Sequence, residues 1–361
     1  MIKIINKLRS KFFNLINKKI YIYKYRKNSI LIKKFQYKKI KKVNVYKIIN
    51  GKIFTNSVDD AAYLKNNFLI KEPSYQYRNS KNSKPKNNII FKYGTNRLLK
   101  KYNGKIISII SGGAAKHNYG HWLFDSISRL LIVLKFKDLK KFDFIYVPAL
   151  KNKFQLDTLK FLKINKNRII SSEKNKFIQG KEIICTNHPF EHRFDKIPKI
   201  IIKDLKKSYL KFAKLSKIKN YKKIYIERDY SKFNLNNNIH TYKDQRILIN
   251  NHEIKNYLKS LGFKSLKLKN LSFADQIKLF SNANIIISMF GAELSNLIFC
   301  KKGTKVLEIK NNKRLNDFKN ISIKCKLKHH QINLKPIYKS SVLQNGILYC
   351  PLKKLKTLLK I

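Results

Sequence analysis

The chain has 361 residues, of which 43% are hydrophobic and 12% aromatic, so it can bury a sizeable core and is long enough for two domains. This composition excludes an intrinsically disordered chain, which would hold far fewer apolar residues. The net charge of +61 is extreme, yet 71 of the 81 basic residues are Lys, and Lys, Asn and Ile are abundant along the whole chain. That pattern indicates nucleotide bias, whereas specific nucleic-acid binding favours Arg. We therefore expect no specific nucleic-acid partner, but attraction to anionic lipid or to an anionic substrate.

The cysteines and the apolar runs bear on the compartment. The cysteines have no CxxC spacing, which is typical of reduced thiols in a cytoplasmic protein; they are Cys185, Cys300, Cys325 and Cys350. No apolar run approaches the roughly 18 residues that span a bilayer. Lys and Asn also interrupt the N-terminal apolar runs, so a signal peptide is not expected.

Residues 1–20 have the pattern of a basic amphipathic helix. Their apolar residues recur at spacings of three and four, on one helical face: Ile5, Leu8, Phe12, Leu15 and Ile16. Two interpretations stay open. The helix packs on its own domain, or it lies on an anionic membrane surface.

Residues 21–105 mix short apolar runs with Lys and Asn, and they predict only mixed strands and loops. The pattern then predicts strands at 106–110, 142–148, 168–172 and 181–187, with helices at 118–136, 153–163 and 197–217. A Lys-rich segment near 216–222 is a candidate hinge. Beyond it, strands are predicted at 223–228, 263–268, 284–290 and 304–309, and helices at 251–262, 272–283 and 292–300. Such alternation predicts an α/β fold with a parallel, doubly wound sheet, in which ligands bind beyond the carboxyl ends of the strands.

The sequence "IIISMFGAELSN" at 285–296 places a buried strand directly before a Gly291–Ala292 turn and a predicted helix. This arrangement aims backbone N–H groups and the positive end of the helix at the cleft, which suits a phosphate, although many α/β domains use it for packing alone. Glu293 then either stabilises the helix dipole or faces the ligand. Asn296 is either a second-turn hydrogen-bonding group or exposed.

Two arginines stand out in a chain that otherwise uses Lys. Arg228 follows the predicted strand 223–228 and should point into the cleft, and Arg246 is predicted to open the next helix with Asn250 one turn later. Arg at both places suggests planar, bidentate binding of phosphate or carboxylate. The alternative is a pair of surface salt bridges.

The helix predicted from Asn118 carries His121, Asp125 and Ser128 on one face and apolar residues on the other. A His and an Asp one turn apart can hydrogen-bond, and the carboxylate then fixes the tautomer and raises the basicity of the ring. The alternative is that the His, together with the only Trp of the chain, completes a polar contact in the core.

Taken in order, "HNYGHWLFDSISRL", Arg228, "RILINNHE" and "SFADQIKLFSNANIIISMFGAELSNLIFCKKGTKVLEI" resemble glycosyltransferase family 61, over roughly residues 106–310. Many bacterial members of that family are described as capsular polysaccharide biosynthesis proteins. The resemblance implies a GT-B-like fold, with two Rossmann-like domains whose parallel sheets face a central cleft. It also implies inverting transfer from a nucleotide-sugar donor, without a cofactor or an obligatory metal.

The resemblance maps onto named positions. Those that match family motifs are Asn118, His121, Asp125, Arg228, Arg246, Asn250, Gln276, Gly291, Ala292, Asn296 and Glu308. Many members carry His immediately before the Gly-Ala turn, where this chain has Phe290, so a role of that His is not carried over. The domains implied are an acceptor-side domain at 1–215 and a nucleotide-sugar-binding domain at 216–335. Residues 336–361 form a final strand or helix, with a return to the first domain as one alternative.

The mechanism expected of such an enzyme assigns each group a role. The leaving diphosphate would be held by Arg228, Arg246 and the turn at Gly291, together with Asn250, Ala292, Glu293 and Asn296. The acceptor would be oriented or deprotonated by His121 or Asp125. The partners expected are a nucleotide sugar, a glycan or lipid-linked glycan acceptor in capsular or lipopolysaccharide-type synthesis, and an anionic membrane surface on the cytoplasmic side. The alternatives are a pyruvyltransferase-like enzyme and a non-enzymatic basic binder of nucleic acid or membrane.

Overall fold

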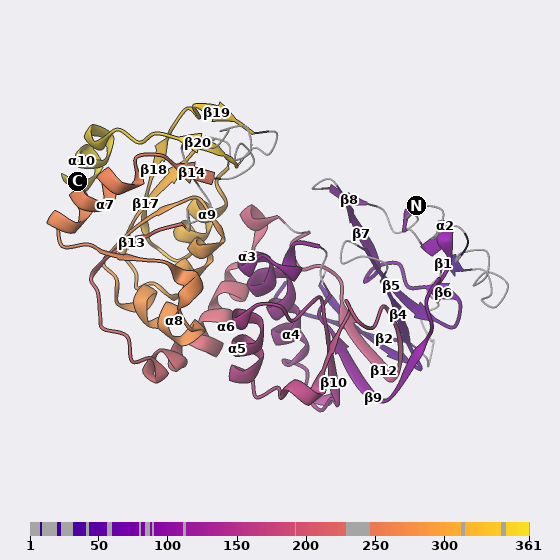
Figure 1. Cartoon of the computed structure of the whole chain (residues 1–361). Coiled ribbons are helices and arrows are strands. Elements are labelled where there is room, and N and C mark those ends of the chain that lie inside the picture. The colour runs from indigo at the N-terminus through magenta and orange to yellow at the C-terminus, as the bar shows by residue number, and fades with distance from the viewer. Residues whose placement is uncertain are drawn as a thin grey trace. The chain divides into compact units, whose positions relative to one another are not determined.

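The structure is a computed structural model with two compact units, unit 1 at Met1–Asp204 and unit 2 at Leu205–Ile361 (Figure 1). It describes residues 8, 20–22, 32–40, 43–55, 60–78, 81–83, 87–88, 90–110, 113–191, 193–228, 246–311, 315–340 and 344–360. The amphipathic helix predicted at 1–20 lies outside the described residues except for Leu8 and Ile20, and the loop 229–245 lies outside them entirely. No helix among the described residues is long and apolar enough to cross a membrane.

Unit 1 is built on one large mixed sheet. Its described strands are β1 (Tyr21–Ile22), β2 (Ile32–Gln36), β3 (Asn44–Ile49), β4 (Lys52–Phe54), β5 (Asp60–Lys65), β6 (Phe68–Leu69), β7 (Tyr75–Arg78), β8 (Lys81–Ser83), β9 (Lys100–Ser108), β10 (Phe144–Val147), β11 (Ile169–Ser171) and β12 (Phe177–Thr186). The main path of the sheet runs β1-β6-β5-β4-β12-β9-β10-β11, with β2, β3, β7 and β8 paired beside it. The expectation of mixed strands over 21–105 is confirmed.

The expectation that the first unit is a Rossmann-like domain with a wholly parallel sheet is wrong. All pairs among β2 to β8 are antiparallel, and so are the pairs of β3 and β4 with β12. Strands that follow one another along the chain are joined here by connections too short for the crossover that parallel pairing needs. Between β5 and β6, for example, the turn has only two residues, and Asn66 takes a left-handed φ of 52° there. Parallel pairing is found in β12-β9-β10-β11, and between the short strands β1 and β6.

The helices of unit 1 connect and flank the parallel strands. They are α2 (Ile90–Tyr93), η2 (Gly113–Lys116), α3 (Tyr119–His121), η3 (Trp122–Ile127), α4 (Ser128–Val133), η4 (Lys137–Leu139), α5 (Lys153–Phe161), η5 (Lys166–Arg168), η6 (Phe194–Lys196) and α6 (Lys199–Tyr209), which crosses into unit 2. The helix predicted at 118–136 forms, but its middle turn, η3, is a π-helix. A core of strand residues that includes Tyr46, Ile106, Tyr146 and Ile183 fixes the sheet.

Unit 2 contains the parallel, doubly wound sheet that the alternation predicted. Its elements are η7 (Leu210–Leu215), β13 (Lys223–Ile226), β14 (Arg246–Leu248), α7 (Asn251–Ser260), β15 (Lys264–Leu266), η9 (Leu268–Asn270), α8 (Phe273–Asn282), β16 (Ile285–Met289), η10 (Ala292–Phe299), β17 (Lys305–Lys310), α9 (Asp317–Lys324), β18 (Lys328–Asn333), β19 (Tyr338–Lys339), β20 (Gly346–Leu348) and α10 (Leu352–Lys360). The five-stranded sheet has the order β15-β13-β16-β17-β18, and all its pairs are parallel.

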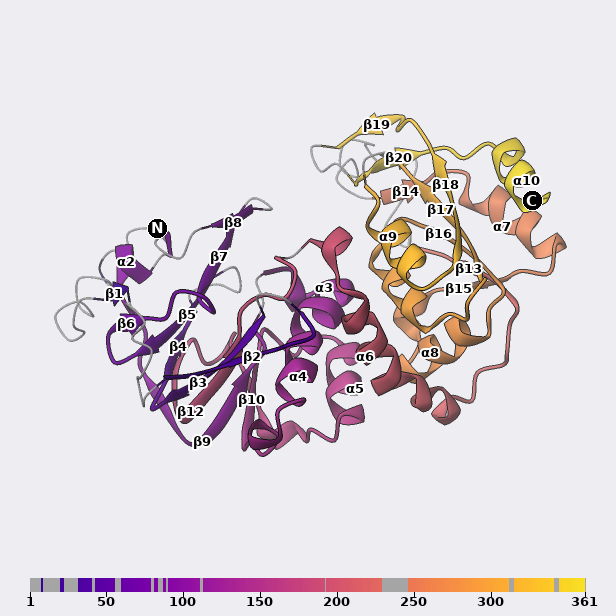
Figure 2. The same cartoon turned by 180° about the vertical axis from the view of Figure 1, so that it is seen from behind.

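The segment that follows β18 stays with unit 2. Strand β20 pairs with β14 and β19 in a small second sheet, and α10 lies beside α7 in both views (Figures 1 and 2). Leu355 of α10 is fully buried in the same core as Leu258 of α7 and Leu307 of β17. Burial of this apolar face holds the C-terminus on unit 2.

Candidate functional site

The first group of predicted site residues gathers at the carboxyl ends of β9 and β12, which are neighbours in the sheet of unit 1. After β9 the chain turns through η2 into α3, and the side chain of Asn118 caps that helix by accepting a hydrogen bond from the His121 N–H at 3.2 Å. The cap fixes where the helix starts and so where His121 and Asp125 lie.

The only tryptophan explains how this helix is held. Trp122 is fully buried, and its indole N–H donates to the hydroxyl of Thr158 on α5 at 2.9 Å. Gln155 of the same helix donates to the carbonyls of Ala115 and Lys116 in the preceding turn. Trp122 therefore anchors the π-helical turn on α5, and such widened turns occur frequently at functional sites.

The predicted hydrogen bond between His121 and Asp125 is present. The Nδ1 atom of His121 lies 2.7 Å from Oδ2 of Asp125, whose side chain is 1% exposed while that of His121 is 22% exposed. An ionised carboxylate only accepts hydrogen bonds, so Nδ1 carries the proton and Nε2 keeps its lone pair. The pair thus has the arrangement of a general base whose tautomer is fixed by a buried carboxylate.

A second imidazole, absent from the sequence prediction, lies on the other side of the carboxylate. The Nε2 atom of His188 is 3.6 Å from Oδ1 of Asp125, and the side chain is 5% exposed. The backbone N–H of Phe190 donates to Nδ1 of His188 at 3.2 Å, so the proton of the neutral ring is on Nε2, toward Asp125. His188 comes two residues after β12, and that position beyond a strand end was the signal that could have identified it.

Aromatic rings and an ion-pair cluster support this group. The Phe194 ring packs against His121 and Phe124, with centroids 4.8 Å and 5.3 Å away. Just beyond β11, Glu173 binds Lys116 at 2.5 Å and Lys151 at 3.2 Å. Burial acts to raise the pKa of Glu173, but the hydrogen bonds from both lysines outweigh it and hold the pKa below its ordinary value. The turn before α3 is thereby fixed at Lys116.

The second group gathers at the carboxyl ends of β13 and β16 in unit 2. The chain leads from β13 to β15 on one side of the sheet and from β16 to β17 on the other. Adjacent strands whose connections diverge make a topological switch point, which is the usual ligand site of an open α/β sheet. Arg228 lies just beyond β13, and Phe290 and Gly291 lie just beyond β16, so both come to this point.

Gly291 is required here for space. Its φ of 179° is extended backbone, but a Cβ on it would come within 2.5 Å of Nη1 of Arg228 and still closer to the Glu293 carboxylate. Arg228 and Glu293 form an ion pair of 3.5 Å above the glycine. Nη1 of Arg228 is buried and hydrogen-bonds to no described residue, so a strong donor is left for a ligand. The segment 292–300 is helical as predicted, but as the 3₁₀ helix η10.

Arg246 joins this group from a strand; the predicted helix start is wrong. It is the first residue of β14, whose pairing with β20, far along the chain, imposes the extended conformation. Its Nη1 donates to the carbonyl of Phe290 at 2.9 Å, and its guanidinium lies 5.8 Å from the centre of the Phe290 ring. Burial, and then the nearby charge of Arg228, lower the pKa of Arg246 to about 10, which leaves it charged at neutral pH. Two guanidiniums thus share one carboxylate, and the excess positive charge favours an anion.

The comparisons with known proteins identify a family for this chain. The family model of Glycosyltransferase 61 matches residues 119–307, just over half of the chain. The chain belongs to the Glycosyltransferase 61 family. It is therefore a glycosyltransferase, as the resemblance implied. No curated protein matches it.

The matched region of this glycosyltransferase holds both groups, including His188, whereas Asn118 and Glu308 lie directly outside its two ends. No three or more His, Cys, Asp or Glu side chains among the described residues are placed to hold a metal ion. The cysteines are free thiols, as expected, and burial raises the pKa of Cys185 and Cys300.

Other predicted positions form hydrogen bonds that fix the elements around the glycosyltransferase site. The Asn250 side chain makes two hydrogen bonds with the backbone of Cys350, of 2.9 Å and 3.0 Å, and so ties the C-terminal segment to the start of α7. Asn296 is fully buried and donates to Gln276 at 3.0 Å and to the carbonyl of Glu293 at 3.1 Å, which fixes η10 on α8. Ala292 begins η10, and its side chain is half-buried.

Glu308 lies deeper, on β17, and is fully buried. His329 and Gln331 of β18 contact its carboxylate at 3.1 Å and 2.8 Å, and Ser322 of α9 bonds the other nitrogen of His329 at 2.7 Å. Paired buried groups of this kind fix the packing of α9 on the sheet.

Proposed function

We propose that this glycosyltransferase moves a sugar from a nucleotide-sugar donor to a hydroxyl of a glycan or lipid-linked glycan acceptor, with inversion and without a metal ion. The observation that carries the proposal is the guanidinium pair, Arg228 and Arg246, at the switch point of a parallel sheet within the family match. A nucleoside diphosphate leaves in such a reaction, and planar, bidentate donors suit its oxygens.

On the donor side, the leaving group gains negative charge as the sugar departs. Nη1 of Arg228 supplies a buried donor without a hydrogen bond to any described residue, and Arg246 is fixed by the Phe290 carbonyl. Donors that are already oriented stabilise developing charge without reorganising. Cationic side chains in these positions take the role that a metal ion has in other transferases.

On the acceptor side, the attacking hydroxyl must lose a proton. Nε2 of His121 accepts it in this proposal, and the buried carboxylate of Asp125 stabilises the imidazolium that forms. His188, with its Nε2–H toward the same carboxylate, holds Asp125 in place and acts as a positioning residue. A single displacement at the anomeric carbon inverts its configuration.

The base and the guanidinium pair belong to different units. A single displacement requires the base to contact the acceptor while the guanidiniums contact the donor bound next to it. The proposal therefore includes the GT-B arrangement implied by the resemblance. We place the enzyme in capsular or lipopolysaccharide-type surface polysaccharide synthesis, at the cytoplasmic face of the membrane. The net charge of +61 supports attraction to an anionic membrane surface.

The deciding experiment measures binding and hydrolysis of a panel of nucleotide sugars by the purified chain, with calorimetry on the matching nucleoside diphosphates. We expect one donor to bind and to be hydrolysed slowly with EDTA present, and the variant Arg228→Gln/Arg246→Gln to lose binding. Arg97→Gln, a control in unit 1, should retain it. The proposal fails if no nucleotide sugar binds, or if the double variant binds as the parent does. With an acceptor, an NMR spectrum of the product that shows retained configuration would contradict inversion.

A further inference from the structure

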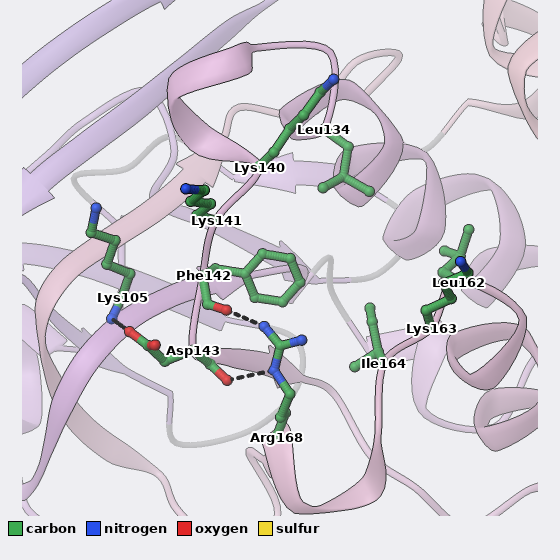
Figure 3. Close-up of a pocket in the computed structure, with 10 residues that line it drawn as sticks. All are labelled: Lys105, Leu134, Lys140, Lys141, Phe142, Asp143, Leu162, Lys163, Ile164 and Arg168. Carbon is green, nitrogen blue, oxygen red and sulfur yellow. Dashed lines mark hydrogen bonds between the residues drawn. The ribbon is translucent and has the colours of Figure 1, made fainter.

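A cavity in unit 1 lies away from the groups described above. Its volume is about 520 Å³, and it opens between the segments that precede β10 and β11, at the amino ends of these strands (Figure 3). His121 and His188 follow the carboxyl ends of β9 and β12 in the same sheet. The cavity therefore lies at the opposite ends of these parallel strands and has no part in the transfer site.

Arg168 supplies a cation that is already oriented in this cavity. Its Nε donates to the carbonyl of Asp143 at 2.9 Å, its Nη2 donates to that of Phe142, and its guanidinium lies 4.5 Å from the centre of the Phe142 ring. The remaining nitrogen points toward the open space (Figure 3). A guanidinium held by two carbonyls and one ring loses little conformational entropy when an anion binds to its free edge.

The rest of the cavity is strongly basic at its rim. Lys140, Lys141 and Lys163 are exposed lining residues, and none forms an ion pair with a described residue. Among the lining residues the only carboxylate is that of Asp143, and it accepts the backbone N–H of Lys105 at 2.7 Å. Five cationic side chains thus line the cavity against one anionic one.

The walls are apolar. Leu134 at the end of α4, Leu162 at the end of α5, and Ile164 face the same space as the Phe142 ring (Figure 3). A free inorganic anion would use the cations but leave these side chains in water. A ligand with both an anionic and an apolar part would satisfy the whole lining.

We propose that this cavity binds the phosphate of an amphiphilic phosphate ester, with the phosphate at Arg168 and the lysine rim and the apolar part against Leu134, Leu162 and Ile164. Such a ligand is either the headgroup of an anionic lipid in a membrane or a dissolved phosphate ester with a short apolar chain. Both sources offer the same chemistry to the cavity.

The chain contains a matched control for the lysine rim. Lys140 and Lys141 are adjacent and exposed, and Lys163 has a left-handed φ of 61°. In unit 2, Lys301 and Lys302 are also adjacent and exposed, and Lys326 beside them has a φ of 59°. Replacing either set of three by Gln removes the same charge, and each set holds one lysine with a left-handed φ. Comparing the two variants separates the cavity from the general charge of the chain.

The test is calorimetric titration of the full chain with dihexanoyl phosphatidic acid below its micelle concentration, and with glycerol 3-phosphate. We expect the lipid to bind more tightly, and the Lys140→Gln/Lys141→Gln/Lys163→Gln variant to bind it roughly tenfold more weakly or worse, while the control triple binds like the parent. Leu162→Gln should weaken binding of the lipid and leave the affinity for glycerol 3-phosphate unchanged.

Sedimentation with phosphatidylcholine vesicles that contain phosphatidylglycerol distinguishes the two sources. If the cavity triple loses vesicle binding and the control triple does not, the ligand is a membrane headgroup; if both retain it, the ligand is the dissolved ester. The proposal is overturned if dihexanoyl phosphatidic acid does not bind, if both triples weaken it equally, or if glycerol 3-phosphate binds as tightly as the lipid.

Discussion

Replacing Gly291 by Ala should damage donor binding and leave the fold intact. The new Cβ would meet Nη1 of Arg228 at 2.5 Å and the carboxylate of Glu293 closer still, and both are ends of flexible side chains. Because φ is 179°, the backbone at Gly291 tolerates any residue. The clash is therefore relieved by moving the ion pair of Arg228 and Glu293, at little cost in stability.

The loss in binding follows from what Arg228 then fails to do. A hydrogen bond to a charged group contributes about 1.5–3 kcal/mol. Displacing this guanidinium should therefore weaken binding of a nucleoside diphosphate by roughly 10- to 150-fold. The matching nucleoside, which has no diphosphate, should bind as before. Calorimetric titration with both ligands measures the difference.

Gly303→Ala provides the opposite control. Gly303 has a φ of +84°, and a Cβ added to it would meet no other atom within 4 Å, so alanine there is strained without touching a neighbour. The substitution should cost roughly 1–2 kcal/mol in unfolding free energy and leave diphosphate binding unchanged. If Gly291→Ala binds the diphosphate like the parent, or loses nucleoside and diphosphate equally, the assigned position of Arg228 is refuted.

Three further predictions concern the other groups. His121→Ala and Asp125→Asn should each cut transfer by about 100-fold while calorimetry shows unchanged donor affinity, and unfolding of both variants would instead assign the pair to packing. Glu173→Gln should lower stability more at pH 7 than at pH 3. The lowered pKa of the folded carboxylate gives a stabilisation that is full above the ordinary value of 4.5 and is lost as the pH falls through the folded value. Equal melting-temperature losses at both pH values would contradict this. Asn250→Ala removes both hydrogen bonds to the Cys350 backbone, so hydrogen exchange in 344–360 should accelerate, and unchanged exchange would argue against the tie.

What the sequence predicted well was local. The hydrogen bond between His121 and Asp125 follows from helical spacing alone, and the alternation after 223 predicted the parallel sheet of unit 2. Arg228 was placed correctly because a strand end is visible in the pattern of apolar residues.

What the sequence could not predict depends on pairing between distant segments. His188 lies beside Asp125 only because β12 pairs with β9, and the spacing of residues along the chain does not predict that contact. Arg246 looked like a helix start, yet its pairing with Gly346 of β20 makes it the first residue of a strand. The mixed sheet of unit 1 was hidden for the same reason, since short apolar runs among Lys and Asn do not reveal their register.

The two groups differ in chemistry in the way that a displacement reaction requires. In each unit, the group lies at the carboxyl ends of two adjacent parallel strands, which is where an open α/β sheet usually binds its ligand. In unit 2 the group contains two guanidiniums, whose planar, bidentate donors suit the proposed departing diphosphate. In unit 1 the group contains an imidazole whose Nδ1–H is held by a buried carboxylate. In the proposed mechanism, the lone pair on Nε2 accepts the proton of the acceptor. A permanent cation cannot serve as that base, and a neutral imidazole is a weak partner for a diphosphate. The division of residue types between the units is therefore the one that the proposed donor side in unit 2 and acceptor side in unit 1 require.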